Sequence, residues 1–322
     1  MKRFLLTAIG AVAAVAPALA QDAYPARPVT VLVPAAAGGP SDTVARIVTQ
    51  AMSEELGTEI VIQNMGGAGG TLGAAQVASA PADGYMLLLY HIGVATSASL
   101  YDDLPYDPGA FVGVGQVADV PMTVIARKDF EPEGVEALIE HLKTNGGEVT
   151  YSHAGIGAAS HLCGMLLMQE IGTQFVEVPY PGTGPALTDL VGGQVDLMCD
   201  QSTNTLGQIE SGEVKAYAVT TLEPVAALPD LPTLANSGMD GFQVSAWHAL
   251  WAPEGTPPEV VETLSTALQA ALENSDVVER LTDLGAEPVS GEEATPEALD
   301  EKLQSEIDKW AKVIEEAGVS AN

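Results

Sequence analysis

The chain has 322 residues, of which 47% are hydrophobic and only 5% aromatic, so it can fill the cores of two domains with aliphatic side chains. Its 12 basic and 43 acidic residues give a formal net charge of −31. This charge excludes nucleic acid and anionic membranes as partners, because both are bound by clustered Lys and Arg. A cationic ligand is a weaker inference, since net charge bears first on solubility and salt tolerance.

The first twenty residues have the features of a secretory signal peptide. Lys2 and Arg3 precede the apolar run 4–16, and residues 17–20 (PALA) supply an A-x-A cleavage pattern. The run is shorter than the roughly 20 residues of a membrane span. A buried N-terminal helix is the alternative. We predict cleavage after residue 20 and a periplasmic location.

Segments typical of strands and of helices alternate along the chain, which predicts an α/β fold. In the first third, apolar β-branched runs indicate buried strands, and apolar residues at helical spacing indicate helices. The expected strands are 29–33, 59–62 and 85–90, and the expected helices are 41–56 and 71–80.

A second unit begins near Pro121 and repeats this alternation, and the last part of the chain is mostly helical. The second unit has expected strands at 122–126, 149–152, 194–199 and 216–220, and helices at 135–143, 160–171 and 185–191, with residues 177–179 leading into a Gly/Pro loop. From about Asp240, the expected elements are a strand at 244–250 and helices at 258–274, 276–284 and 296–317.

The terminal helices have no sheet of their own to cover, so we expect them to return to the first unit. This predicts a two-domain clamshell with a central cleft and two crossings between the domains, near residues 121 and 240. The predicted divisions are a signal peptide at 1–20, a discontinuous domain 1 at 21–121 plus 240–322, and domain 2 at 122–239. Clefts between hinged domains are common ligand sites that close around the ligand.

The clearest candidate site is the loop 34–42, which leads from a buried strand directly into a helix. A helix N-terminus presents unpaired N–H groups and a partial positive charge, both of which suit an anion. Two glycines allow close approach of the backbone, Pro40 fits the first helical turn, and Ser41 or Asp42 is expected to cap the helix. An ordinary capped turn would use the same residues.

A second loop, 153–159, has the same place in the second unit, between the strand 149–152 and a helix that opens at Ser160. Two helix N-termini that face each other across a cleft can hold one carboxylate between them, or two at opposite ends of a ligand. After cleavage the chain keeps four arginines and six lysines, and none lies inside either loop. We therefore expect backbone N–H groups, hydroxyls and water to hold the carboxylate, rather than an Arg fork.

Two cysteines, Cys163 and Cys199, occur in a chain that is expected to leave the cytoplasm. A disulfide is the expected state in an oxidising compartment, and two buried thiols are the alternative. Neither a C-x-x-C nor a His-x-x-His spacing indicates a metal site.

Enzyme motifs are broken or missing. The sequence 155–160 lacks the third glycine of a dinucleotide fingerprint, and G-x-S-x-G, Walker A and H-E-x-x-H motifs do not occur. His91, His153 and His161 lie near the expected cleft, where a hydrolytic dyad is the enzymatic alternative. We predict a binding protein with no catalytic residue, no metal and no cofactor.

An ordered set of motifs across the mature chain resembles the Bug, or TctC-like, periplasmic solute receptors of tripartite tricarboxylate transporters. The motifs occupy residues 24–29, 34–42, 66–70, 81–85, 160–162, 178–183, 189–196 and 228–234. None is decisive alone, but their order is specific. The resemblance implies two α/β domains of the periplasmic-binding-protein kind and a ligand carboxylate pinned by the two loops, partly through water.

The resemblance also assigns site residues position by position. Residues 37–42 and 154–161 match the family's two binding loops, and Asp200, just after the strand 194–199, matches its usual aspartate. The expected ligand-binding residues are Ala37, Gly39, Ser41, Asp42, His91, Ala154, Gly155, Ala159, Ser160, His161, Asp200 and Thr203.

Three departures from the family pattern bear on the size and shape of the ligand. Ala35 replaces a frequent Phe, residues 64–65 depart from the usual Asn-Arg-Pro, and Pro181 replaces a frequent Lys or Arg. The sequence thus predicts a monomeric receptor that delivers a small carboxylate (an aliphatic di- or tricarboxylate, or an aromatic carboxylate) to the membrane subunits of such a transporter. The alternatives are a ligand-sensing module for a two-component kinase and an exported hydrolase.

Overall fold

The computed structural model describes residues 24–321, and the predicted signal peptide lies outside this range. Within it, helices and strands alternate in a mixed α/β fold. The strands are β1 Val29–Val33, β2 Ile60–Asn64, β3 Met86–Tyr90, β4 Val112–Arg127, β5 Thr150–His153, β6 Val176–Pro179, β7 Leu197–Gln201, β8 Val214–Val219, β9 Ser245–Ala252 and β10 Glu287–Pro288. The α-helices are α1 Pro40–Leu56, α2 Thr71–Ala78, α3 Gly93–Leu100, α4 Val135–Asn145, α5 Ala159–Ile171, α6 Thr183–Val191, α7 Ser202–Glu210, α8 Pro258–Glu273, α9 Ser275–Asp283 and α10 Pro296–Ala317. None of the helices between residues 24 and 321 is long and apolar enough to cross a membrane.

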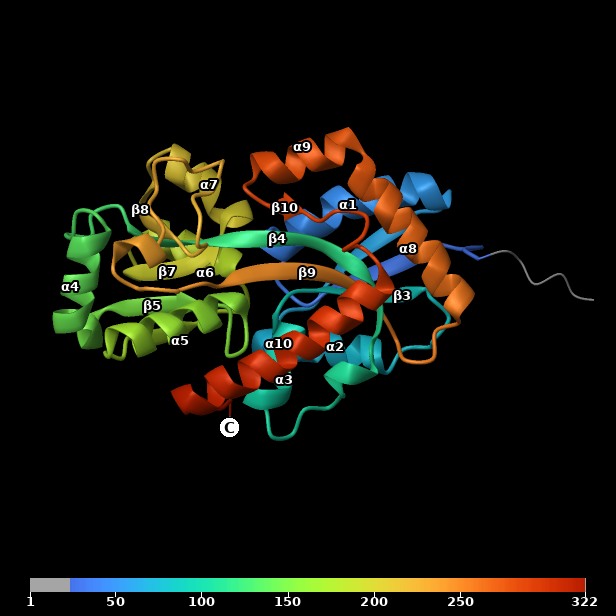
Figure 1. Ribbon diagram of the computed structural model, residues 1–322, viewed down its shortest axis with the longest axis horizontal. Helices are drawn as coiled ribbons and strands as arrows, with labels where there is room; N and C mark the ends of the chain where they lie inside the picture. The colour runs from blue at the N-terminus through green and yellow to red at the C-terminus, as the bar shows by residue number, and fades with distance from the viewer. Residues whose placement is uncertain (1–23, 322) are drawn as a thin grey trace, which may run out of the picture.

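One mixed sheet joins these strands in the order β2-β1-β3-β9-β4-β7-β5-β6. Strand β4 is shared by both ends of the sheet, because residues 112–121 pair with β9 while residues 122–127 pair with β7 and β8. Figure 1 shows β4 and β9 running side by side along the long axis of the molecule. We call the end that contains β1, β2, β3 and β9 the β1 half, and the end that contains β5, β6, β7 and β8 the β5 half.

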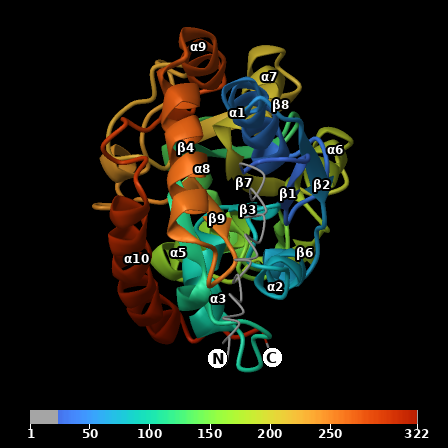
Figure 2. The same cartoon turned by 90° about the vertical axis from the view of Figure 1, so that its right-hand side faces the viewer.

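The β1 half has helices on both faces of its sheet. Both faces of each strand are therefore buried, so its strands are apolar throughout, as β3 shows. Leu87 and Leu89 pack into the core beneath α1 and α8, whereas Leu88 and Tyr90 pack into the core beneath α2, α3 and α10. The terminal helices belong to these layers: α8 packs against α1 and β4, and α10 packs against α3 and β4 (Figure 2).

Several elements differ from the sequence prediction. Strand β4 begins at Val112 rather than near residue 122, and helices α3 and α7 were not expected. Gly113 and Gly115 break the apolar pattern of β4, but a Cβ at either position would collide with α10 or with the chain before it. These glycines therefore allow close packing of helices on the strand rather than ending it. Strand β7 also runs to Gln201, so Asp200 lies inside the strand rather than after it.

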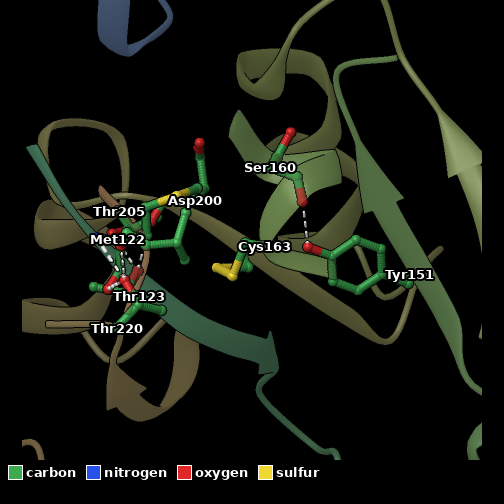
Figure 3. Close-up of a disulfide and its surroundings, with 10 residues drawn as sticks. Met122, Thr123, Tyr151, Ser160, Cys163, Asp200, Thr205 and Thr220 are labelled. Atoms are coloured by element: carbon green, nitrogen blue, oxygen red, sulfur yellow. Dashed lines mark hydrogen bonds between the residues drawn. A yellow bond between two sulfur atoms is a disulfide. The ribbon is translucent and has the colours of Figure 1, made fainter. Parts of the chain in front are cut away.

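The two cysteines form a disulfide that joins helix α5 to strand β7. Cys163 and Cys199 have their Cα atoms 6.1 Å apart and are separated by 36 residues in sequence. Both are fully buried, beside the junction where Met122 meets Thr220 (Figure 3). The bridge fixes the helix that carries the second loop against the strand that carries Asp200.

We expect the double substitution Cys163→Ala with Cys199→Ala to lower the free energy of unfolding by about 4 kcal/mol, because a loop of this length is then free in the unfolded chain. Urea unfolding of the oxidised protein, the reduced protein and the variant would measure the effect. The reduced protein and the variant should agree, and a variant as stable as the oxidised protein would contradict the expectation.

Candidate ligand-binding site

The carboxyl ends of β1, β3, β5 and β7 meet at one cavity between the β1 half and the β5 half. The cavity is small, with a volume of about 30 Å³. Its walls are made by Pro34, Ala35, Ala36, Gly39, Pro40, Ser41, Gly67, Gly69, Gly70, His91, Ala154, Ala158, Ala159, Ser160, Pro181, Gly182, Thr183, Asp200 and Gln201. Most of these residues are small, so backbone groups form much of the surface that a ligand would touch.

The first loop is held from inside helix α1 by Asp42. Its Oδ2 accepts hydrogen bonds from the Gly38 N–H and the Arg46 Nε, each at 2.9 Å, and its Oδ1 accepts one from the Asn64 amide at 3.0 Å. Burial acts to raise the pKa of Asp42, but these three hydrogen bonds together lower it. The charge of Arg46 is thus used to hold the loop.

The predicted capping role was wrong for both Ser41 and Asp42. The N-cap of α1 is Gly39, and no side chain bonds to the first turn from that position. Asp42 instead reaches backward to Gly38, while Gly39, Pro40 and Ser41 at the start of α1 line the cavity.

The Ser41 hydroxyl is engaged with a histidine of the central sheet. The His248 Nδ1 lies 3.1 Å from the Ala246 carbonyl oxygen, which can only accept, so this nitrogen carries the proton. The Ser41 hydroxyl therefore donates to the His248 Nε2 at 3.0 Å. Burial, together with neighbouring His91, lowers the pKa of His248 to about 3, and burial lowers that of His91 to about 4, so both rings are neutral at physiological pH.

The second loop is held by two histidines in a similar way. The Gly155 N–H donates to the His153 Nδ1 at 3.1 Å, and the Gly157 N–H donates to the His161 Nδ1 at 3.3 Å. Each Nε2 lies 3.7 Å from a carboxylate oxygen of Glu177. Burial lowers the pKa of both rings, that of His161 to about 4 with a further contribution from His153.

Ser160 completes the second loop and points into the cavity. Its Oγ accepts a hydrogen bond from the Ala154 N–H at 3.0 Å, and the Tyr151 hydroxyl donates to its carbonyl oxygen. Figure 3 shows the Ser160 hydroxyl and the Asp200 carboxyl extending to the same side, away from the disulfide. The N-termini of α1 and α5 and the end of β7 therefore face one space.

The two halves touch around the rim of the cavity. The Tyr101 hydroxyl of the β1 half donates to the Ile156 carbonyl oxygen at the tip of the second loop, at 2.7 Å. A Cβ at Gly69 would lie only 1.9 Å from that same oxygen, so this contact requires glycine. On the far side, the Ser202 hydroxyl donates to the Gly285 carbonyl oxygen at 3.0 Å. These contacts join the two halves.

Asp200 is the carboxyl side chain of the cavity wall, and it is fully buried. Its Oδ2 accepts a hydrogen bond from the Asn204 amide at 2.5 Å, whereas its Oδ1 has no hydrogen-bonding partner within the chain. Burial raises the pKa of Asp200 to about 7, against the hydrogen bond from Asn204 and the nearby polar Gln201 N–H and Thr183, which favour its charged form.

Among the residues described between 24 and 321, no Lys or Arg lines this cavity, and no group of His, Cys, Asp or Glu side chains has a metal-binding arrangement. An anion in the cavity would therefore be held by N–H dipoles at two helix N-termini and by hydroxyls. The donors on offer include the Ser160 hydroxyl.

The structure brings most of the expected site residues to the cavity wall. The residues that line it are Gly39, Ser41, His91, Ala154, Ala159, Ser160 and Asp200. The remaining expected residues, which do not line it, are Ala37, Asp42, Gly155, His161 and Thr203.

The sequence reasoning missed two parts of the wall. One is the glycine-rich stretch 67–70, which was expected only to lead into a helix, and the other is the turn 181–183 before α6. Closely spaced glycines followed by a helix were a usable signal, because Gly69 and Gly70 have positive φ angles that other residues rarely adopt.

These features define a class of protein. Two α/β halves joined by continuous strands, with a closed cavity of backbone donors between them, form the fold of periplasmic binding proteins, which act as solute receptors. The structure of periplasmic binding protein BugD superposes with a TM-score of 0.90 at 51% sequence identity, over 92% of this chain and 99% of that chain.

The chain belongs to the tripartite tricarboxylate transporter family receptors (TctC), whose sequence profile matches residues 44–319. It is 56% identical, over 94% of its length and 87% of the relative's, to the UPF0065 protein in the TAR-I ttuE-ttuC' intergenic region of Agrobacterium vitis. MatC from Rhodopseudomonas palustris with bound malate is 42% identical, with a TM-score of 0.87 over 90% of this chain and 100% of that chain. Because this is a family of solute-binding receptors, the hydrolase alternative is excluded.

We expect Asp42→Ala to lower the free energy of unfolding by about 1–3 kcal/mol, because the Gly38 N–H and the Asn64 amide lose their buried acceptor. Asp42→Asn should cost less, since its side-chain oxygen can replace one of the two carboxylate oxygens. Urea unfolding of the three proteins would test this order. Equal stability of Asp42→Ala and the unsubstituted protein would show that the carboxylate does not hold the loop.

Proposed function

We propose that this protein captures a small carboxylate in the cavity between its halves and delivers it to the membrane subunits of a tripartite tricarboxylate transporter. The observation that carries the proposal is the convergence of the α1 and α5 N-termini on a cavity whose described lining contains no Lys or Arg. A carboxylate suits such a site because unpaired N–H groups and the helix dipole favour negative charge. The malate bound to the related MatC supports a small dicarboxylate as the ligand.

The expected site residues have two roles in this proposal. Those on the cavity wall contact the ligand: Gly39, Ser41, His91, Ala154, Ala159, Ser160 and Asp200. The others act through the loops or the neighbouring wall: Ala37, Asp42, Gly155, His161 and Thr203. Gly155 and His161, for example, fix the second loop through hydrogen bonds at Gly155 and Gly157.

The proposal includes a monomeric protein in the periplasm, released there after cleavage of residues 1–20. The relationship to a periplasmic binding protein and the basic, apolar and A-x-A features of the N-terminus support this location. The disulfide between Cys163 and Cys199 fits an oxidising compartment.

A thermal-shift screen tests the ligand class. We expect malate, succinate, adipate or an aromatic carboxylate to stabilise the protein in a saturable way, by about 2.7 kcal/mol at a concentration of 100 times Kd. Putrescine and glucose serve as a cationic and a neutral comparison. Stabilisation by these two alone would refute the proposal.

A substitution on the cavity wall tests whether the carboxylate binds in this cavity. Ala159→Leu should abolish the response to the carboxylate, because Ala159 lines the cavity at the start of α5 and the larger side chain fills it. Ala226→Leu makes the same change at an exposed position and should respond as the unsubstituted protein does. Circular dichroism without ligand establishes that both variants are folded.

We also propose that the two halves are hinged domains, with domain 1 at 21–121 plus 240–322 and domain 2 at 122–239. The change of pairing partner along β4, between Pro121 and Met122, supports the first boundary. The Thr220 hydroxyl lies within hydrogen-bonding distance of the Met122 N–H and donates to the Val244 carbonyl oxygen at 2.6 Å, so both crossings meet at one point.

Ligand should favour the closed arrangement, because only then do both helix N-termini reach it. Small-angle scattering is expected to show a smaller radius of gyration when the stabilising carboxylate is added. Tyr101→Phe, which removes a hydrogen bond between the halves, should weaken ligand affinity, whereas Tyr24→Phe, which removes one within the β1 half, should not. An unchanged radius on tight binding would indicate a cavity that does not open.

A further inference from the structure

Unpartnered polar atoms gather at one end of the β5 half. Of the buried side-chain polar atoms in residues 24–321, those without a hydrogen-bonding partner are Ser152 Oγ, Asp200 Oδ1, Gln201 Oε1, Thr203 Oγ1 and Trp251 Nε1. Three of the five belong to the consecutive stretch 200–203, and Asp200 and Gln201 line the cavity. Buried polar groups normally have a hydrogen-bonding partner, so the unpartnered oxygens of Asp200 and Gln201 on the cavity wall point to a polar ligand.

The charge of this site poses a physical problem for a carboxylate ligand. Asp200 has no exposed surface, and within the described chain no Lys or Arg borders the cavity to offset its charge. Two ionised carboxylates in contact in a site of low dielectric repel each other strongly, and such a pair retains a proton. The ligand's own charge therefore opposes an ionised Asp200.

The groups around Asp200 do not remove this repulsion. Thr123 of β4, Asn204 of α7 and Thr183 of α6 are neutral, and the Arg46 guanidinium of α1 is bound to Asp42. Titratable groups on the surrounding elements include Tyr151 and His153 of β5, His161 of α5, Glu177 of β6, His91 after β3, Asp42 of α1 and His248 of β9. The histidines among them are held neutral by burial, and Tyr151 and Glu177 can add no positive charge. Arg127, at the end of β4, is bound to Asp129 and Asp196.

Resting on the function proposed above, we propose that Asp200 binds the ligand in its protonated form, so that the capture of one carboxylate ligand takes up one proton from solvent. The proton lies on Oδ1, whose hydroxyl donates to an oxygen of the ligand carboxylate. Oδ2 remains the acceptor for the Asn204 amide. A hydrogen bond between Asp200 and the ligand carboxylate thus replaces the repulsion between two negative charges, and the otherwise unpartnered Oδ1 gains a partner.

The position of Asp200 favours this linkage before any ligand arrives. Burial already raises its pKa to about 7, so at neutral pH a substantial fraction of the side chain carries the proton. A ligand carboxylate that binds the protonated form raises the pKa of Asp200 further. The reason is that proton binding and ligand binding strengthen each other by the same factor. Affinity should therefore be highest below neutral pH and should decline as the pH rises.

The rival arrangement is an ionised Asp200 that accepts a hydrogen bond from a hydroxyl or ammonium group of the ligand. It predicts the opposite pH dependence, or none, over the range in which Asp200 ionises. The two arrangements also differ in their response to Asp200→Asn. Because the Asn204 amide fixes the carbonyl oxygen of the new side chain at the Oδ2 position, its NH2 group takes the place of the protonated Oδ1.

The experiment is calorimetric titration of the full chain with L-malate between about pH 6 and pH 9, where both malate carboxyls are ionised. Between about pH 7 and pH 8, where both phosphate and Tris buffer, each titration is run in each of them, because their different heats of ionisation report the number of protons taken up. We expect Kd to rise by up to tenfold per pH unit above neutrality, with uptake of up to one proton. Asp200→Asn should bind with a Kd near that of the unsubstituted protein at pH 6, with no pH dependence and no proton uptake.

Asp230→Asn is the matched control, because it removes an exposed carboxylate that does not line the cavity and should keep the unsubstituted pH dependence. Malate binding with a constant Kd and no proton uptake would overturn the proposal and leave the receptor function intact. Loss of binding in a folded Asp200→Asn protein would overturn it in favour of the rival arrangement. Failure of malate, succinate and adipate to bind at any pH would overturn both this proposal and the proposed function.

Discussion

The pairing of β4 with β9 is the contact on which the arrangement of the two halves depends. Residues 112–121 of β4 pair with β9 in the β1 half, and the same strand continues through residues 122–127 between β7 and β8. A continuous hydrogen-bonded strand is stiff, so it fixes which edges of the two halves face each other. As a result, the carboxyl ends of β1 and β3 from one side and of β5 and β7 from the other open onto the same cavity.

Burial then decides the charge state of the groups around this cavity. It lowers the pKa of His91, His161 and His248 and raises that of Asp200, because removal from water penalises the charged form of either kind of side chain. Among the described residues, the nearest arginine to the first loop, Arg46, is bound to Asp42. The positive potential of the site thus comes from helix N-termini, in a chain whose formal net charge is −31.

Small residues allow the halves to come into contact around the ligand space. A Cβ at Gly66 would lie 2.5 Å from the Pro181 carbonyl oxygen, and one at Gly182 would lie 2.7 Å from the Ala36 Cβ. Larger side chains at these positions would hold the halves apart. The hydroxyl of Tyr101 and the carbonyl oxygen of Ile156 then form a hydrogen bond across the contact. The shape of the cavity therefore depends on these glycines, which have no side chain, as well as on the side chains that line it.

The sequence by itself determined the α/β class, most helices and strands, the family and the two loops, because each of these depends on local patterns. Apolar runs such as 29–33 and helical spacing such as 296–317 can be read without knowing their neighbours. The full length of β4 could not be predicted from the sequence. Glycine is needed at positions 113 and 115 because α10 and the segment that contains Ala294 pack closely on the strand there. Likewise, only the tertiary structure decided that Ser41 bonds to His248, 207 residues away, and that Asp200 has a buried oxygen without a partner. Burial and long-range hydrogen bonding are properties of the packed chain, and they set the chemistry of the cavity.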